Sequence, residues 1–227
     1  KRLVSAAENY LLRLHTLTDD ADLPGSNAPV LTGDTAEQPI LMTGHQPVVF
    51  HSGLTFKYET AQQVAADSRA IAVAVVIDTD SGDAGQFSYP HAVTDTESGE
   101  SATLEIESLA SSNGLFAHGR LKPAEELQDL GKKVSAQLNH LSLPDSATAV
   151  AQSFQEFAQL SAAKATAAEA NTIMRRQHGV GARMLELPFS AMSAFPEMLA
   201  FTADILKQAR RFAAAYNASL EMYRDEN

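Results

Sequence analysis

The chain has 227 residues, of which 44% are hydrophobic, and its formal net charge is −11. Because it contains no cysteine, disulfides, thiolate metal sites and a cysteine nucleophile are excluded. The negative charge argues against binding to nucleic acid or to anionic membranes, since each phosphate contact requires a lysine or an arginine. No segment is typical of a signal peptide and no apolar run approaches the length of a membrane span, so we expect a cytoplasmic protein.

Residues 1–39 are predicted to form one helix and a linker. Within residues 3–17, apolar side chains recur at helical spacing and form a single stripe. Residues 19–38 combine Asp, Pro, Gly, Ser, Asn and Thr with few large apolar side chains, which is typical of a loop.

Residues 40–80 predict a β-α-β unit. A short apolar run at residues 40–42 stops at Gly44, and an amphipathic helix follows over residues 53–66. Residues 71–77 then form a near-continuous apolar run, which is typical of a parallel strand that is buried on both faces. The polar residues cluster where the strands end and the helix begins, and open α/β sheets bind ligands at that edge.

The remainder of the chain changes from mixed to helical character. Residues 103–107 alternate as a half-exposed strand does, and residues 115–121 fit either a partner strand or a lid. Helices are expected from Pro123, from a cap at Asp145 or Ser146 to about Glu169, and from near Pro196, with a short strand at residues 184–187. The sequence begins at Lys1 and stops at Asn227 within a predicted helix, so we expect a fragment of a longer protein.

These elements predict an α/β fold. We expect a Rossmann-like parallel sheet of about four or five strands, with helices on both faces, over residues 40–122. A mainly helical segment, truncated at its C-terminus, is expected over residues 123–227.

The loop from Thr43 to Gly53 is the first candidate site. A helix N-terminus exposes N–H groups and a partial positive charge, so the start of the following helix suits a phosphate or a carboxylate. The loop would supply further donors and close backbone approach through Thr43, Gly44, His45, Gln46, His51, Ser52 and Gly53. The alternative is that these residues have only structural roles, with Gly44 in a turn, Ser52 as a helix cap and the histidines as ordinary loop residues.

Asp78 and Asp80, at the end of the second predicted strand, are the second candidate. Carboxylates at this position suit Mg²⁺ or the hydroxyls of a ribose. The alternative is a solvated turn rich in aspartate.

Two weaker groupings remain. His45, His51 and His91, with the two aspartates, offer ligands for a transition metal, although no His-x-His or His-x-x-x-His pair is present. Arg175 and Arg176, with His178, could bind an anion. Paired arginines on a helix more often form its wet face, and we favour that interpretation.

The central stretch resembles the bacillithiol-synthesis cysteine-adding enzyme family, whose core is related to the HxGH nucleotidyltransferases and class I synthetases. Its T-G-Q-Q, Phe, G-P-L and Tyr positions are matched here by Thr43, Gly44, Gln46, Phe50, Leu54 and Tyr58. Asp78 and Asp80 match the aspartates of its E-D-H-D motif, and residues 51–54 are similar to an HxGH motif whose last histidine is leucine. The chain departs from the family at His45, Ser52, Gly53, Ile77 and Thr79.

The chain also resembles uncharacterised bacterial proteins that share a T-G-H-Q-x-x-x-x-H-x-G stretch and a tail like residues 185–224. We therefore expect a distant relative of the cysteine-adding enzymes, and we do not carry their activity over to this chain.

The resemblance and the predicted edge together imply a nucleotide-binding enzyme of the nucleotidyltransferase or ATP-dependent ligase type. ATP or another small-molecule nucleotide would be the ligand, with Mg²⁺ held by Asp78 and Asp80. His51 and His45 would stabilise charge on the transferred phosphoryl group. A non-catalytic binding or scaffold module and a metal-dependent hydrolase are the alternatives, and the sequence leaves the oligomeric state open.

The β-α-β prediction has a geometric consequence. If strands 40–43 and 71–77 are parallel, then His45, the turn at residues 51–53 and Asp78 all lie at the carboxyl edge of the sheet. We expect their side chains to line a single pocket.

Overall fold

The computed structural model describes residues 1–25, 38–48, 52–95 and 99–226, and side chains within these ranges except those of residues 92–102 and 226. Contacts divide the chain into two compact units, Lys1–Phe189 and Ser190–Asn227. The segment boundaries expected after residues 39 and 122 both lie inside the first unit.

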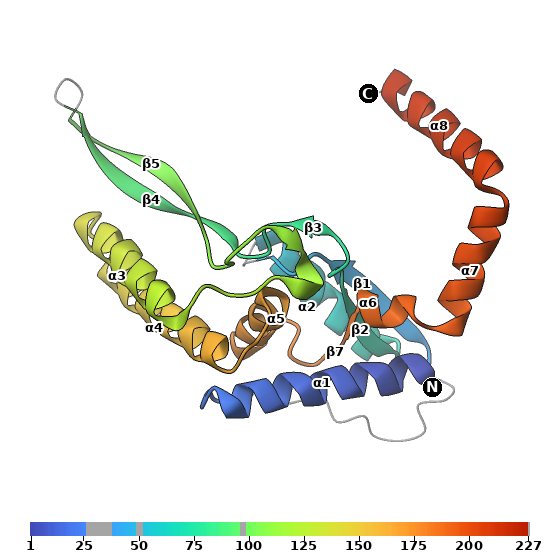
Figure 1. Ribbon diagram of the computed structural model, residues 1–227, viewed down its shortest axis with the longest axis horizontal. Coiled ribbons are helices and arrows are strands. Elements are labelled where there is room, and N and C mark those ends of the chain that lie inside the picture. The colour runs from blue at the N-terminus through green and yellow to red at the C-terminus, as the bar shows by residue number, and fades with distance from the viewer. Residues whose placement is uncertain (26–37, 49–51, 96–98, 227) are drawn as a thin grey trace. The chain divides into compact units, whose positions relative to one another are not determined.

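A three-stranded parallel sheet forms the centre of the first unit (Figure 1). Its strand order is β1 (Ile40–His45), β2 (Ile71–Val76) and β7 (Leu185–Pro188), with β2 in the middle. The helix α2 (Ser52–Asp67) joins β1 to β2, so the predicted β-α-β unit and its parallel pairing are confirmed. The described part of this sheet has fewer strands than expected, because the other strands pair among themselves in separate small sheets.

Helices flank the parallel sheet, as the α/β prediction requires. On one face, Leu54, Tyr58 and Ala61 of α2 pack against Ala74 of β2 and against Met184. The helix α1 (Arg2–Asp20) packs against β7. Because neighbouring residues of a strand point to opposite faces, the burial of Val73, Ala74, Val75 and Val76 shows that β2 is covered on both sides. The uninterrupted apolar sequence of β2 follows from this double burial.

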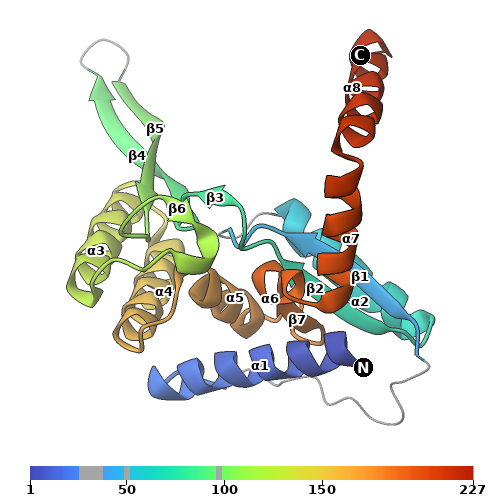
Figure 2. The same ribbon diagram turned by 45° about the vertical axis from the view of Figure 1, so that its right-hand side comes forward.

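The strands after β2 form two small antiparallel sheets. The short strands β3 (Ser81–Gly82) and β6 (Gly114–Leu115) pair with each other, and the 3-10 helix η1 (Phe116–His118) follows β6. The longer strands β4 (Gln86–Asp95) and β5 (Gly99–Ser108) form a hairpin ribbon beside the helices that follow (Figure 2). The strand expected at residues 103–107 is therefore part of β5, and residues 115–121 contain only the second residue of β6, followed by η1.

Three helices complete the first unit: α3 (Ala124–His140), α4 (Pro144–Ala162) and α5 (Ala167–Gln177). The helices α3 and α4 pack closely at Gly131, where an added Cβ would lie 2.6 Å from the Cβ of Phe154. The prediction of one helix from about residue 146 to Glu169 is wrong. Lys164 adopts a positive φ of 63° that ends the helical path, and Thr166 then caps α5 through a capping box with Glu169.

The second unit is helical. It contains α7 (Pro196–Lys207) and α8 (Ala209–Glu226), and α6 (Phe189–Ser193) spans the boundary between the units. The helix expected from Pro196 is thus divided, with Gln208 as the C-cap of α7. Among the residues that the structure describes, no helix combines the length and the apolar character that a membrane span requires.

Candidate functional site

The carboxyl edge of β1 and β2 gathers the residues singled out from the sequence. In the register of the two strands, Gly44 lies opposite Val75 and His45 lies opposite Val76. Beyond the paired residues, the Ile77 N–H donates to the His45 carbonyl at 2.9 Å. The segments that follow both strands therefore start side by side, as the parallel β-α-β prediction requires.

A hydrogen bond joins the two candidate loops at this edge. The Gln46 side-chain amide donates to Asp80 Oδ2 at 2.9 Å, and the Ser81 N–H donates to Asp80 Oδ1 at 2.8 Å. The Gln46 amide, followed by the Ser81 N–H, holds the pKa of the Asp80 carboxyl below its usual value, because both donors favour the ionised form. Asp80 is thus an oriented carboxylate that remains exposed to solvent.

Asp78 lies in a different environment from Asp80, because it is only 5% exposed. Its backbone carbonyl accepts from the Ala117 N–H at 2.8 Å, and the Asp80 carbonyl accepts from the Phe116 N–H at 3.0 Å. The η1 turn, within the segment expected to be a strand or a lid, therefore fastens the backbone of the aspartate loop. The result is one buried and one exposed carboxylate on a fixed turn.

Gly44 makes close packing possible at the end of β1. A Cβ at this position would lie 3.0 Å from the Val75 carbonyl oxygen and 3.3 Å from the Val75 Cβ, which is tighter than ordinary contact. The Gly44 carbonyl also accepts a hydrogen bond from Lys57 Nζ of α2. Sequence reasoning missed this lysine. Its place near the start of a helix that begins at the ligand edge is the signal that could have indicated it.

Asn171 of α5 is a second residue that sequence reasoning missed. Its side-chain amide donates to the Pro47 carbonyl at 2.9 Å and to the Ala84 carbonyl at 2.6 Å. It is 6% exposed and connects the loop after β1 with the segment between β3 and β4. No sequence pattern indicated this role, because Asn171 lies 124 residues after Pro47.

The other predicted site residues occupy varied positions. Thr43 is half-buried opposite Ala74, and His45 is half-buried with Nδ1 3.1 Å from the Gln46 carbonyl oxygen. Ser52 and Gly53 begin α2 and are exposed. His51, like Phe50, lies outside the described residues, so the expected single pocket remains a prediction.

The grouping of histidines and aspartates as a transition-metal site receives no support from the described ranges. His91 is on the hairpin, where its Nδ1 lies 3.1 Å from Glu105 Oε2. Within residues 1–25, 38–48, 52–95 and 99–226, no group of three or more His, Asp or Glu side chains is placed to hold a metal ion.

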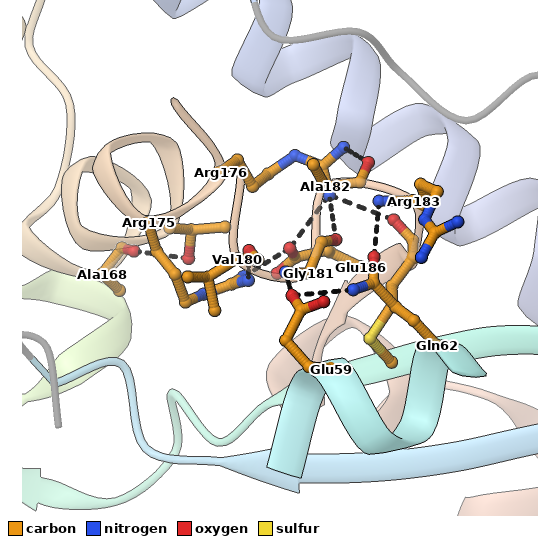
Figure 3. Close-up of polar contacts among 12 residues, drawn as sticks. Glu59, Gln62, Ala168, Arg175, Arg176, Val180, Gly181, Ala182, Arg183 and Glu186 are labelled. Atoms are coloured by element: carbon orange, nitrogen blue, oxygen red, sulfur yellow. Dashed lines mark hydrogen bonds and ion pairs between the residues drawn. The ribbon is translucent and has the colours of Figure 1, made fainter. Parts of the chain in front are cut away.

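Arg175 and Arg176 form a buried network, so their interpretation as a wet helix face is wrong (Figure 3). Both guanidinium groups form ion pairs with Oε1 of Glu186, which is fully buried on β7. Arg175 also lies over the Tyr58 ring, 4.2 Å from its centroid. The two guanidinium groups also donate hydrogen bonds to backbone carbonyls of the loop before β7, namely those of Val180, Gly181, Ala182 and Met184.

The loop around the two guanidinium groups is also fixed to α2. The Gly181 N–H donates to Glu59 Oε1 at 3.3 Å, and the Arg183 N–H donates to Gln62 Oε1 at 2.9 Å. Gly181 has a φ of +69°, and a Cβ there would lie 2.3 Å from Arg175 Nη1. The two arginines thus act on protein acceptors and hold β7 in place.

The carboxyl edge therefore offers an exposed carboxylate, a buried carboxylate and an amide on two adjacent loops, together with a histidine at the end of β1 and a lysine of α2. No family model, curated protein or solved structure matches the chain. The chemistry of this edge is accordingly interpreted from its own residues.

Proposed function

We propose that the protein binds a nucleotide at the carboxyl edge of β1 and β2 and acts as a nucleotidyltransferase or an ATP-dependent ligase. One observation carries the proposal: the parallel pairing of β1 and β2 brings Gln46 into hydrogen-bond contact with Asp80. The start of α2 follows the same end of β1. Open α/β sheets bind their ligands in the crevice beyond the carboxyl ends of their strands.

The phosphates would lie against the loop after β1 and the start of α2. Gly44 carries no side chain there, and the first N–H groups of a helix attract anions through their partial positive charge. The lysine that bonds the Gly44 carbonyl, Lys57, supplies a positive charge beside this loop. His45 and His51 would donate hydrogen bonds to charge that develops on the transferred phosphoryl group.

The two aspartates fit Mg²⁺, because this ion commonly binds one or two carboxylates together with substrate phosphates. Asp80 is exposed and its lowered pKa keeps it ionised at neutral pH, so it remains an oxygen ligand. When bound, Mg²⁺ would neutralise charge on the phosphate oxygens. The two carboxylates would otherwise repel a polyphosphate, and nucleotide binding should therefore require the metal.

Calorimetric titration with ATP, ADP and CTP tests the proposal. Each nucleotide is added once with excess Mg²⁺ and once with EDTA. We expect saturable binding of at least one nucleotide with Mg²⁺ and clearly weaker binding with EDTA. The absence of binding at millimolar nucleotide in the presence of Mg²⁺ would remove the proposed function.

A non-catalytic binding module is the second candidate, and the second unit favours it. No residue of α7 is buried, and large apolar side chains such as Phe201, Leu206 and Phe212 are more than half exposed, at 59%, 69% and 53%. Melting temperatures measured with and without nucleotide separate the two candidates. The proteins compared are the wild type, His51→Ala and Asp78→Ala. An enzyme should lose its nucleotide-induced shift in both variants, whereas a scaffold should show no such shift in any of the three proteins.

A further inference from the structure

A cavity of about 350 Å³ lies in the first unit, away from the strand edge described above. Residues of β4 line it on one side and residues of α3 and α4 on the other, and it is open to solvent on its less buried side. Figure 2 shows β4 beside these two helices. This volume lies within the range of about 300–1,000 Å³ that is usual for small-molecule sites.

The wall of this cavity is apolar and buried. Tyr89, Leu109, Val134, Leu138, Phe154 and Phe157 line it, and each is at most 6% exposed. Protein interiors are normally packed with few voids larger than a water molecule. Apolar side chains that line an open pocket lack the packing contacts of a filled interior, so an apolar occupant would supply those contacts.

The elements around the cavity are fixed to one another by specific contacts. The Phe87 ring meets the Phe154 ring edge-on, with centroids 5.5 Å apart, and joins β4 to α4. On the same face of the hairpin, where Glu105 and Glu107 of β5 pair with Tyr89 and Phe87, Lys133 of α3 forms ion pairs of 2.6 and 2.8 Å with these two glutamates. The cavity therefore lies between the helices α3 and α4 and a hairpin that is held to them by ring contacts and ion pairs.

The polar groups around the cavity indicate which ligands it would accept. Ser146 and Ser153 of α4 line its less buried side. Near Tyr89, the carboxylates of Glu105 and Glu107 outnumber the ammonium group of Lys133. A ligand with an anionic end group would be repelled there, whereas a neutral hydroxyl or amide could bond to the serines.

We propose that this cavity is a binding site for a small neutral amphiphile. Its apolar chain or ring would fill the aromatic and aliphatic wall, and its hydroxyl or amide end would face the serine hydroxyls. This site is separate from the nucleotide site and does not rest on the nucleotidyltransferase proposal.

Octanol and octanoate test the proposal, because they share one chain and differ in the charge of the end group. Binding is measured by calorimetry for the wild type, Val150→Phe and Ala151→Phe. Val150 is half-buried in the cavity wall, so the added ring would occupy the cavity, whereas Ala151 is an exposed neighbour on α4 that does not line it. We expect the wild type and A151F to bind octanol saturably, V150F to bind it at least about tenfold more weakly, and octanoate to bind the wild type at least about tenfold more weakly than octanol.

A second measurement places the ligand in the wild-type protein, so the result does not depend on the folding of a variant. Intermolecular NOEs from octanol should reach the methyl groups of Val134, Leu138 and Val150. The proposal is overturned if the wild type shows no saturable binding, or if the NOEs arise only elsewhere. Equal octanol affinity of a folded V150F, or octanoate binding as tight as octanol binding, would also overturn it.

Discussion

Glu186 is the counter-charge of two buried arginines in the first unit. It is 0% exposed and forms ion pairs with Arg175 and Arg176, which are 7% and 2% exposed. Removal of the carboxylate would leave two guanidinium groups buried without a counter-charge. A buried pair of this kind costs much to break, even where the intact pair adds little net stability.

Glu186→Gln should therefore lower the free energy of unfolding by about 3–5 kcal/mol, because its shape is kept and its charge is lost. Denaturant unfolding measures this change. Glu156→Gln on α4 is the control, since Glu156 accepts only a surface hydrogen bond from Gln152, and its effect should stay within about 0.5 kcal/mol. Equal, small effects of the two substitutions would contradict the assigned role of Glu186.

Tyr58 provides a test of the same network through pH. Burial raises the pKa of the Tyr58 hydroxyl to about 12, and the nearby Arg175 opposes part of this rise. The folded pKa lies above the unfolded value of about 10. The contribution of Tyr58 to folding stability is therefore fully present below about pH 10 and is lost as the pH rises through about 12. Phenolate absorbance of the wild type minus that of Tyr58→Phe should rise near pH 12. A difference curve centred near pH 10 would show that Tyr58 is not buried in this way.

The residues of the candidate site were predictable to different degrees. Gln46 and Asp80 could be predicted because Gln46 directly follows β1, Asp80 lies in the turn after β2, and parallel strands end at one edge. Lys57 and Asn171 were not predicted, since their contacts depend on how α2 and α5 dock against the loops. Paired arginines carry no sequence signal that separates a buried cluster from a wet face, so the burial of Arg175 and Arg176 appeared only in the structure.

At the level of the elements, one lysine of α3 links that helix to the hairpin by ion pairs. The hydrogen bonds that Lys133 donates to Glu105, and then to Glu107, raise the pKa of Lys133, and the Lys133 ammonium lowers the pKa of Glu105. The raised lysine pKa contributes stability that is lost only as the pH rises above its ordinary value. The lowered glutamate pKa contributes stability that is lost as the pH falls through its folded value.

Lys133→Ala should release the hairpin without unfolding the first unit. Hydrogen exchange of the β4 and β5 amides should become faster, whereas exchange in β1, β2 and β7 should not change. Lys132→Ala is the matched control, because Lys132 forms only an exposed ion pair with Asp129 in the same helix. Faster hairpin exchange in both variants, or in neither, would contradict the assigned role of Lys133.

Thr166 determines where α5 begins. Its hydroxyl accepts from the Glu169 N–H at 3.1 Å, and Glu169 Oε2 accepts from the Thr166 N–H at 2.8 Å. Thr166→Ala should lower the free energy of unfolding by about 1 kcal/mol, as the loss of an N-cap usually does. Thr148→Ala within α4, whose hydroxyl bonds only to the Pro144 carbonyl, should change it by less than about 0.5 kcal/mol. A thermal or denaturant scan that ranks Thr148 above Thr166 would contradict the cap.

The predictability of the elements follows from their burial. The strand β2 was predictable because both of its faces are buried, and the parallel pairing with β1 followed from the helix between them. The partner of β7 was not predictable, since Leu185 lies more than a hundred residues after Val73. The strand β4 was missed because residues 81–85 before it are rich in turn-forming residues and Pro90 lies within it. Its pairing with β5 keeps both strands out of the parallel sheet.

At the level of the whole molecule, the first unit contains both proposed sites. The nucleotide would bind where β1 and β2 end, and the amphiphile would bind between β4, α3 and α4. The second unit has seven large apolar side chains more than half exposed: Leu199, Phe201, Leu206, Phe212, Tyr216, Met222 and Tyr223. The enzymatic proposal therefore rests on the first unit alone.

The most direct test of the nucleotide proposal compares two charge-neutralising substitutions at opposite ends of one β-α-β unit. Asp80→Asn keeps the shape of the proposed metal ligand, whereas Asp67→Asn alters an exposed carboxylate at the end of α2 that is far along the chain from the loop after β1. Calorimetry with ATP and excess Mg²⁺ should show binding at least about tenfold weaker for D80N and unchanged for D67N. Wild-type affinity in a folded D80N, or equal losses in both variants, would contradict a nucleotide site at the carboxyl edge.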